Sequence, residues 1–202
     1  MKPFVFLIFT ISQILVALAN AASVEELDLS QMSVMADSII VGRCTAVQPE
    51  WRGGKIFTKT TVQIDQHIKG NGNNTMEITS LGGTAIHPTL NVPVTMSVGG
   101  GLSFQENEEV VLFTKRSPQG MHQVIGMSLG KFEVKTERET RRKLVPLSQK
   151  KLDMMPPGTF TPRAKKNGGD IEQSLKPRDM DLNEFIQKIR DNIPTEVNRQ
   201  NN

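Results

Sequence analysis

The sequence contains one cysteine, one tryptophan and no tyrosine in 202 residues. A single cysteine excludes an intramolecular disulfide and a zinc site built from thiolates. Aromatic residues make up 5% of the chain, so stacking surfaces for single-stranded nucleic acid or for sugars are hard to assemble. Beyond the first 22 residues, no apolar run approaches the length that spans a bilayer. The composition is that of an ordinary globular chain and excludes a fibre, a coiled coil and a polytopic membrane protein.

The first 21 residues have the three-part layout of a secretory signal peptide. Lys2 precedes an apolar stretch over 4–18, and small residues follow at Ala19 and Ala21. Cleavage is expected before Asn20 or Ala22, which predicts a soluble mature protein that is periplasmic or secreted and has no transmembrane segment. The alternative is an uncleaved membrane anchor, for which the apolar stretch is short.

Residues 22–148 combine short apolar segments with turns rich in glycine and asparagine. Over 56–68, apolar or threonine residues alternate with polar ones, which predicts a long strand with one buried face. The continuous apolar runs at 39–47 and 110–113 predict strands that are buried on both faces. Helical spacing at 24–37 predicts a short helix before the first strand. The sequence therefore predicts a mainly β fold, a small antiparallel OB-like barrel or sandwich with a short N-terminal helix.

The last third of the chain has a different charge. From 20 to 134 there are eight basic and eleven acidic residues, a net charge of −3, whereas from 135 to 202 there are fifteen and ten, a net charge of +5. Residues 149–178 are rich in proline, glycine, lysine and asparagine, which predicts a disordered linker within a flexible basic tail. An amphipathic helix is predicted over 179–194, because its apolar residues recur at helical spacing before Pro194.

Five segments follow one another over 36–134: ADSIIVGRCTAVQPEW, GGKIFTKTTVQIDQHIKG, TMEITSLGG, VGGGLSFQENEEVVLF and HQVIGMSLGKFEV. In this order they resemble a class of small exported bacterial β-barrel domains of unassigned function. In that class a long strand ends in V-x-K-G, and a later turn and strand read F-x-x-G-E-E-V-V-L-F. The strand layout is also similar to the OB-like barrel of the tissue inhibitors of metalloproteinases and of netrin-type modules.

The resemblance implies a barrel and transfers no catalytic residue. The metalloproteinase inhibitors chelate the zinc of the enzyme through an amino-terminal cysteine, and the expected mature start here has none. Asn107 stands where the bacterial pattern has glycine, a replacement that asparagine allows because it tolerates a positive φ.

The candidate binding residues lie in the basic tail and the terminal helix. The tail residues could contact an anionic surface polymer, although a solvated linker is the ordinary explanation for such clusters; nucleic acid is excluded as a partner by the expected export. The apolar face of the helix either packs back on the barrel or binds a groove on another exported protein. The candidates are Arg141, Arg142, Lys143, Lys165, Lys166, Phe185 and Ile189.

No catalytic or metal-binding pattern stands out. The histidines, His67, His87 and His122, are far apart, and their spacing matches no metal site; His67 is expected at the surface. Cys44 lies in an apolar run and is expected to be a small buried hydrophobic residue, with a reactive or partner-linking thiol as the alternative. The acidic residues of 106–109 are expected to be solvated.

The predicted function is that of an exported, soluble binding or accessory module without a cofactor and without catalytic activity. One alternative is an inhibitor or partner of an exported peptidase, which depends on the similarity in barrel layout. The other is a hydrolase that uses Ser103 or Cys44 with a histidine.

Overall fold

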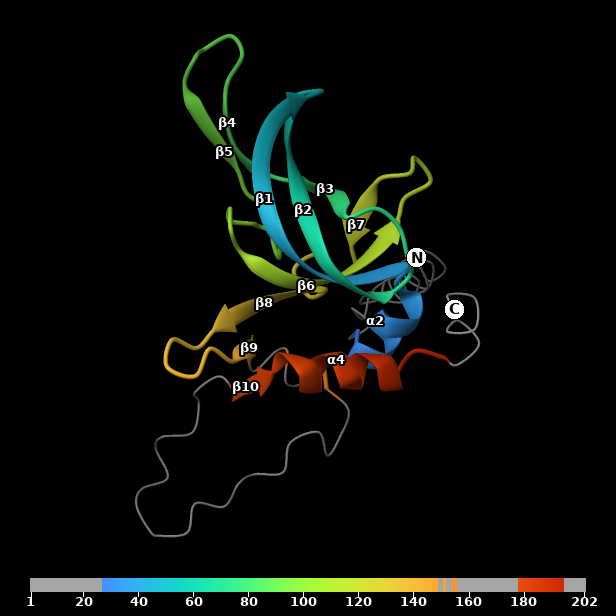
Figure 1. The fold of residues 1–202 in the computed structure, drawn as a ribbon. Helices are drawn as coiled ribbons and strands as arrows, with labels where there is room; N and C mark the ends of the chain where they lie inside the picture. Colours follow the sequence, from blue (N-terminus) through green and yellow to red (C-terminus); the bar gives the residue numbers. More distant parts are fainter. Residues whose placement is uncertain (1–26, 149–150, 152–153, 156–177, 195–202) are drawn as a thin grey trace, which may run out of the picture.

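The computed structural model describes residues 27–148, 151, 154–155 and 178–194 (Figure 1). The elements in chain order are α2 (Leu29–Met35), β1 (Ser38–Arg52), β2 (Lys55–Lys69), β3 (Thr75–Leu81), β4 (Gly83–Ile86), β5 (Pro93–Met96), β6 (Glu109–Arg116), β7 (His122–Val124), β8 (Lys131–Thr136), β9 (Lys143–Leu147), β10 (Arg178–Asp181) and α4 (Leu182–Asp191). Neither described helix is long and apolar enough to cross a bilayer. The predicted signal peptide and residues 156–177 of the predicted linker lie outside the described residues.

Five strands close into a barrel in the order β1-β2-β3-β7-β6, because β6 also pairs with β1. β3 and β7 are parallel, and the other neighbours in this ring are antiparallel. Closure pairs the backbone N–H and C=O groups that the edge strands of an open sheet would leave exposed. The closed ring confirms the predicted mainly β class and favours the OB-like barrel over the sandwich. Between β3 and β6, the hairpin of β4 and β5 projects beside the barrel (Figure 1).

β1 and β2 form a long curved ribbon that makes up much of the barrel wall (Figure 1). The alternation predicted over 56–68 is present, with Ile56, Thr58, Thr60 and Val62 buried. β1 shifts register against β2 at three places, which lets the strand bend. At Gly42 the strands approach so closely that a Cβ atom would overlap the carbonyl oxygen of Gln63, so this position requires glycine.

Two hydrophobic cores meet at β6, where every residue from Glu109 to Thr114 is buried. Val110 and Leu112 point into the barrel, while Val111 and Phe113 point into a second core below it. The apolar runs at 39–47 and 110–113 therefore arise because β1 and β6 separate two cores. Asn107, in the turn before β6, stands where the bacterial pattern has glycine. Its φ of 67° is the positive value that asparagine tolerates at such a position.

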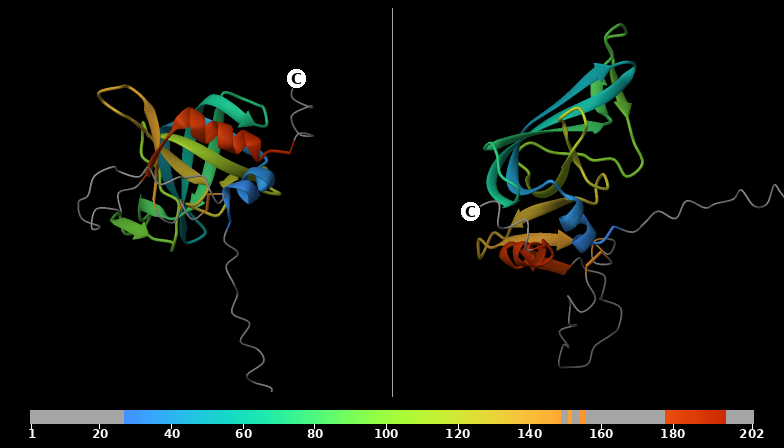
Figure 2. Two further views of the ribbon diagram at one scale, coloured as in Figure 1. Left: turned by 90° about the horizontal axis from the view of Figure 1, so that it is seen from below. Right: turned by 90° about the vertical axis from the view of Figure 1, so that its right-hand side faces the viewer.

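The second core lies between the strands β8–β10 and the helices α2 and α4. β8 pairs with β6, and β9 and β10 extend the sheet beyond it. α4 lies along this extension on the side away from the barrel (Figures 1 and 2). The ring of Phe132 packs between those of Phe113 and Phe185, at centroid distances of 5.7 and 4.8 Å. α2, predicted at 24–37, begins at an Asp28 capping box and contributes Leu29 and Met32.

The terminal helix belongs to the folded domain. Phe185 and Ile189 are fully buried in the second core, so the prediction that they bind a partner groove is wrong, and the alternative that the helix packs back is confirmed. The helix is also shorter than the predicted 179–194, because residues 178–181 pair with β9 as β10. The spacing of apolar residues identified the helix, but it could not show which surface covers them.

The predicted disordered linker, 149–178, is wrong at its two ends. Met154 and Met155 are buried in the second core, and the N–H of Leu29 donates to the carbonyl oxygen of Met154 at 2.9 Å. At the other end, Arg178 belongs to β10. Met154, Met155 and Arg178 contact elements distant in sequence, which composition alone does not reveal.

Replacement of Phe185 by alanine is expected to lower the free energy of unfolding by about 3–5 kcal/mol, because it opens a cavity against Phe132. Gln187→Ala, on the exposed face of the same helix, is the matched control and is expected to change it by less than about 0.5 kcal/mol. Denaturant unfolding measures both variants. Equal effects would show that α4 is not part of the cooperative core.

Candidate functional site

The predicted basic binding residues are partly engaged within the fold. The Arg142 guanidinium lies 3.1 Å from the Asp181 carboxylate at the start of α4, and Lys143 Nζ lies 2.5 Å from a Glu109 carboxylate oxygen. Arg141 is exposed in the turn between β8 and β9 with φ of 57°. Lys165 and Lys166 lie outside the described residues. Arg142 and Lys143 therefore connect the start of β9 to α4 and to β6, although all three cations are exposed to solvent.

The acidic turn before β6 holds an ion-pair cluster. Glu109, expected to be solvated, is 6% exposed and pairs with Lys143 and, at 3.5 Å, with Arg43. Beside it, Glu108 pairs with Lys131 Nζ at 2.6 Å. The expectation of solvated charge is wrong for these two glutamates because β1 and β8 flank the start of β6 and cover it. The cluster fixes the turn, and its charges are satisfied by one another.

Glu109→Gln is expected to lower the free energy of unfolding by roughly 1–2 kcal/mol, because the amide cannot satisfy both Arg43 and Lys143. The control is Glu106→Gln, which removes an exposed carboxylate from the same turn and is expected to have an effect within about 0.5 kcal/mol. Denaturant midpoints at neutral pH compare the two. An equal effect of both variants would contradict the structural role of Glu109.

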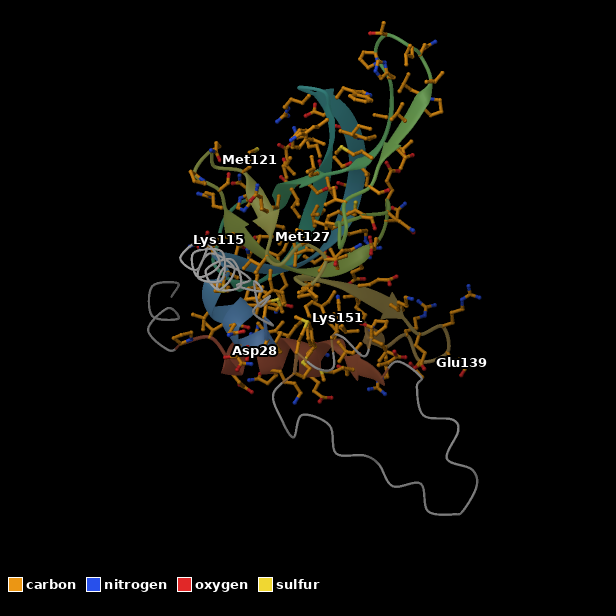
Figure 3. The ribbon with its side chains drawn as sticks, turned by 180° about the vertical axis from the view of Figure 1, so that it is seen from behind. Asp28, Lys115, Met121, Met127, Glu139 and Lys151 are labelled. Carbon is orange, nitrogen blue, oxygen red and sulfur yellow. The ribbon has the colours of Figure 1, made fainter. Side chains whose placement is uncertain are left out.

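Lys151 is a half-buried lysine that the sequence places in the linker. Its Nζ lies 4.0 Å from the centroid of the Phe132 ring and donates to the Lys131 carbonyl oxygen. Burial, and then the charge of Lys131, lower the pKa of Lys151 to about 8. Figure 3 shows Lys151 close to α4, beside the second core. Its contacts are with the fold, and no described cavity is lined by it, so we regard it as structural.

The lowered pKa of Lys151 predicts a pH-dependent stability. In the unfolded chain this lysine keeps its proton up to about pH 10.5, whereas in the folded protein it loses it near pH 8. Unfolding therefore takes up a proton between these values, and stability rises with pH across the window. Lys151→Met is expected to raise the free energy of unfolding at pH 7 by about 1–2 kcal/mol, because it removes a half-buried charge.

Denaturant unfolding of wild type and Lys151→Met at pH 7 and pH 10 tests this. The advantage of the variant should shrink as the pH rises, because wild type gains stability from the deprotonation of Lys151 and the variant has no such gain. The chain has no tyrosine, whose titration would overlap this window. Lys69, whose pKa burial also lowers, is present in both proteins and cancels. A pH-independent difference would contradict the assignment.

The candidate nucleophiles are not placed beside a histidine. Cys44 is fully buried in the barrel core, which confirms the expectation of a small buried hydrophobic residue, and burial raises the pKa of its thiol, with the nearby Glu108 adding to the rise. Ser103 lies on an exposed loop, and its carbonyl oxygen accepts from Lys131 Nζ at 2.6 Å. The cavity that Ser103 lines contains no histidine, aspartate or glutamate. This geometry does not supply a base to either group.

Two histidines that are distant in sequence meet at one end of the barrel. His67 of β2 and His122 of β7 line a cavity of about 470 Å³ together with Asp37 and Arg116. Both ring nitrogens of His67 and Nδ1 of His122 are buried without a hydrogen-bond partner. His67, which was expected at the surface, is partly enclosed. It lies at the barrel mouth, where β2 extends past the end of β3. Burial, and then the charge of Arg116, lower the pKa of His122.

The loop between β4 and β5 carries the other feature that the sequence reasoning missed. Ile86, Leu90 and Val92 are 56%, 65% and 46% exposed on this projecting hairpin. Between the hairpin and the barrel lies a cleft of about 440 Å³ lined by Leu81, Met96, Val98, Leu102, Phe104 and by hydroxyl and backbone groups. One signal could have found this surface, since the sequence has no charged residue between Glu77 and Glu106.

These arrangements differ in the chemistry that they allow. The hairpin and its cleft offer apolar contacts and hydroxyl groups, which suit binding of an uncharged protein surface. The barrel mouth offers imidazoles and a guanidinium. Among the described residues, no group of three or more histidine, cysteine, aspartate or glutamate side chains is placed to hold a metal ion. No protein-family model matches the chain, and no curated protein matches it.

Proposed function

We propose that this protein is an exported binding module that recognises another exported protein through the loop between β4 and β5. The observation that carries the proposal is the group of large exposed apolar side chains on this loop, Ile86, Leu90 and Val92. Apolar side chains that cluster on a projecting surface are typical of protein interaction sites. Export is inferred from the layout of residues 1–21.

The loop is held in one conformation by His87. The His87 N–H donates to the Val92 carbonyl oxygen at 2.8 Å, and its own carbonyl oxygen accepts from Asn91 N–H at 2.9 Å. The Nδ1 atom of the His87 ring accepts the N–H groups of Thr89 and Leu90, each at 3.2 Å. Because the loop is already ordered, less conformational entropy is lost when a partner binds it.

The same histidine ties the hairpin to the barrel. The ring of His87 packs edge-on against Trp51 at a centroid distance of 4.9 Å, near the end of β1. Thr84 and Thr95 share a hydrogen bond of 2.8 Å across the two strands of the hairpin. These contacts support the loop from both sides, so the three apolar side chains are presented on a supported surface.

The absence of charge favours a protein partner over an anionic polymer. Residues 78–105 contain no aspartate, glutamate, lysine or arginine, so the hairpin offers nothing to neutralise phosphates or sulfates. The cleft beside the hairpin continues the apolar surface, with Leu81 40% exposed at its edge. A partner with a complementary apolar pocket would bury Leu90 at the centre of the contact and leave polar groups at its rim.

Inhibition of an exported peptidase is the second candidate function, favoured by the shape of the loop. A supported, protruding loop with a leading apolar side chain, Leu90, can enter a substrate cleft without the loss of entropy that a flexible substrate incurs. This mechanism needs no metal-chelating cysteine. It would be shown by stoichiometric inhibition of the partner with the loop left uncut.

The test uses a photo-crosslinking residue at position 90 and, as the matched control, at position 34. Val34 is 52% exposed on α2, whose other side packs on the second core through Leu29 and Met32. Crosslinking in the native envelope or secreted fraction, followed by mass spectrometry, should identify one protein at position 90 that is missing at position 34. The affinity of that purified protein should fall at least about tenfold with Leu90→Asp and stay unchanged with Val34→Asp.

Crosslinking of the same protein from both positions, or an affinity that Leu90→Asp leaves unchanged, would overturn the proposal. Capture of nothing at position 90 would also contradict it. If the partner is a peptidase, its activity with and without equimolar wild-type protein separates the inhibitor from a module that binds elsewhere on that enzyme.

A further inference from the structure

The mouth of the barrel lies at the opposite end of the β1–β2 ribbon from the projecting loop. His67 pairs with Ile40 near the start of β1, whereas Trp51, which supports the loop, pairs with Ile56 beside the hairpin turn. The cavity at the mouth, about 470 Å³, has the volume of an ordinary small-molecule site. It is therefore a separate feature from the surface proposed to bind a protein.

Two buried imidazoles at this mouth lack hydrogen-bond partners. Three ring nitrogens, Nδ1 and Nε2 of His67 and Nδ1 of His122, are enclosed and unbonded within the described residues. An unsatisfied buried polar group destabilises a fold, so each such group calls for an explanation. A bound molecule that offers oxygen atoms to the imidazoles would satisfy them.

The strand register brings a guanidinium to the same place. Arg116 of β6 is directly opposite His122 of β7, so their side chains share one face of the sheet. Among the described residues the Arg116 side chain makes no salt bridge, and its backbone N–H donates to the Asp37 carboxylate at 2.8 Å. The guanidinium is thus available to a ligand, and guanidinium groups bind carboxylates and phosphates in a bidentate manner.

The charges around the cavity favour an anion over a metal cation. The cavity is lined by the Arg116 guanidinium and the imidazoles of His67 and His122, with Lys69 nearby, and Asp37 is the acidic residue that lines it. Lys69 Nζ is already engaged, since it donates to the carbonyl oxygens of Ser33 and Val34 at the end of α2, 2.9 Å from each. A metal ion would face Arg116, and His67, His122 and Asp37 are not placed to hold it together, since no such group of three is found among the described residues.

We propose that the barrel mouth binds a small molecule through a carboxylate or phosphate group held by Arg116, His67 and His122. The anion accepts hydrogen bonds from the guanidinium and from imidazole N–H groups. The amide groups of Asn71 and Asn73, in the turn after β2, border the same cavity and can contact the remainder of the ligand. Because an anion beside the His122 imidazole favours its protonated form, binding strengthens as the pH falls.

NMR spectroscopy of the histidine side chains tests this in the whole protein. Inorganic phosphate and succinate are the two probes, titrated at pH 6 with chloride holding the ionic strength constant. His67 and His122 should shift saturably and His87, in the distant loop, should not; His67→Gln and His122→Gln assign the signals. The pKa of His122 should rise on saturation, and the tighter probe shows which of the two groups the site prefers. At pH 8 the affinity should be at least about tenfold weaker.

Two neighbouring substitutions provide the matched control. Arg116→Gln should weaken binding at least about tenfold, whereas Lys115→Gln, which removes the same charge from the other face of β6, should change it less than about twofold. Lys115 and Met121, labelled in Figure 3, mark the two strand ends at this mouth. An unshifted His87 signal shows that each variant is folded. If Arg116→Gln does not fold, His67→Gln, also expected to weaken binding, is the second test.

Several outcomes would overturn the proposal: equal or absent shifts at all three histidines, equal losses from Lys115→Gln and Arg116→Gln, or saturable shifts with zinc but with neither anion. The last outcome would identify a metal site instead. None of these results bears on the loop between β4 and β5, whose partner is tested by crosslinking at position 90.

Discussion

The pairing of β6 is the constraint on which the rest of the structure depends. Along one edge β6 pairs with β1, which closes the barrel; along the other, its first half pairs with β8 and its second half with β7. The sheet divides at this point into the barrel and the extension that carries α4. Since both faces of β6 are buried, Leu112 and Phe113 stabilise two cores at once. The barrel and the terminal helix are thus parts of one folding unit.

The same arrangement explains why many charged residues serve the fold. The start of β6 is enclosed, so Glu109 needs cationic partners, and β1 and β9 supply Arg43 and Lys143. Lys143, one of the predicted basic binding residues, is therefore engaged by a buried carboxylate. A count of basic residues overestimates the charge available to a ligand, because some of those residues neutralise buried carboxylates. Arg116, in contrast, has no ion-pair partner among the described residues and lies beside a cavity lined by imidazoles.

The sequence predicts features that depend on local periodicity. The alternation over 56–68 gives β2, the apolar run at 110–113 gives β6, and the spacing around Phe185 gives α4. The features that the sequence does not predict depend on contacts between segments that are distant in the chain. Met154 is ordered because it meets Leu29, and His67 and His122 share a cavity because β2 and β7 end at the same mouth. The exposed loop could have been found, because the stretch from 78 to 105 without charge is visible in the sequence.

The two candidate surfaces lie at opposite ends of one ribbon, and this separation bears on how they can act. Trp51, beside His87, lies eleven residues after Ile40, which is opposite His67, a distance of roughly 35 Å along the strand. A protein that covers Leu90 therefore leaves the mouth open, and both surfaces can be occupied together. Their chemistries do not compete either, because the loop has no charge and the mouth is polar. In the two functions proposed above, the barrel would be the spacer between a small anion at one end and a protein partner at the other.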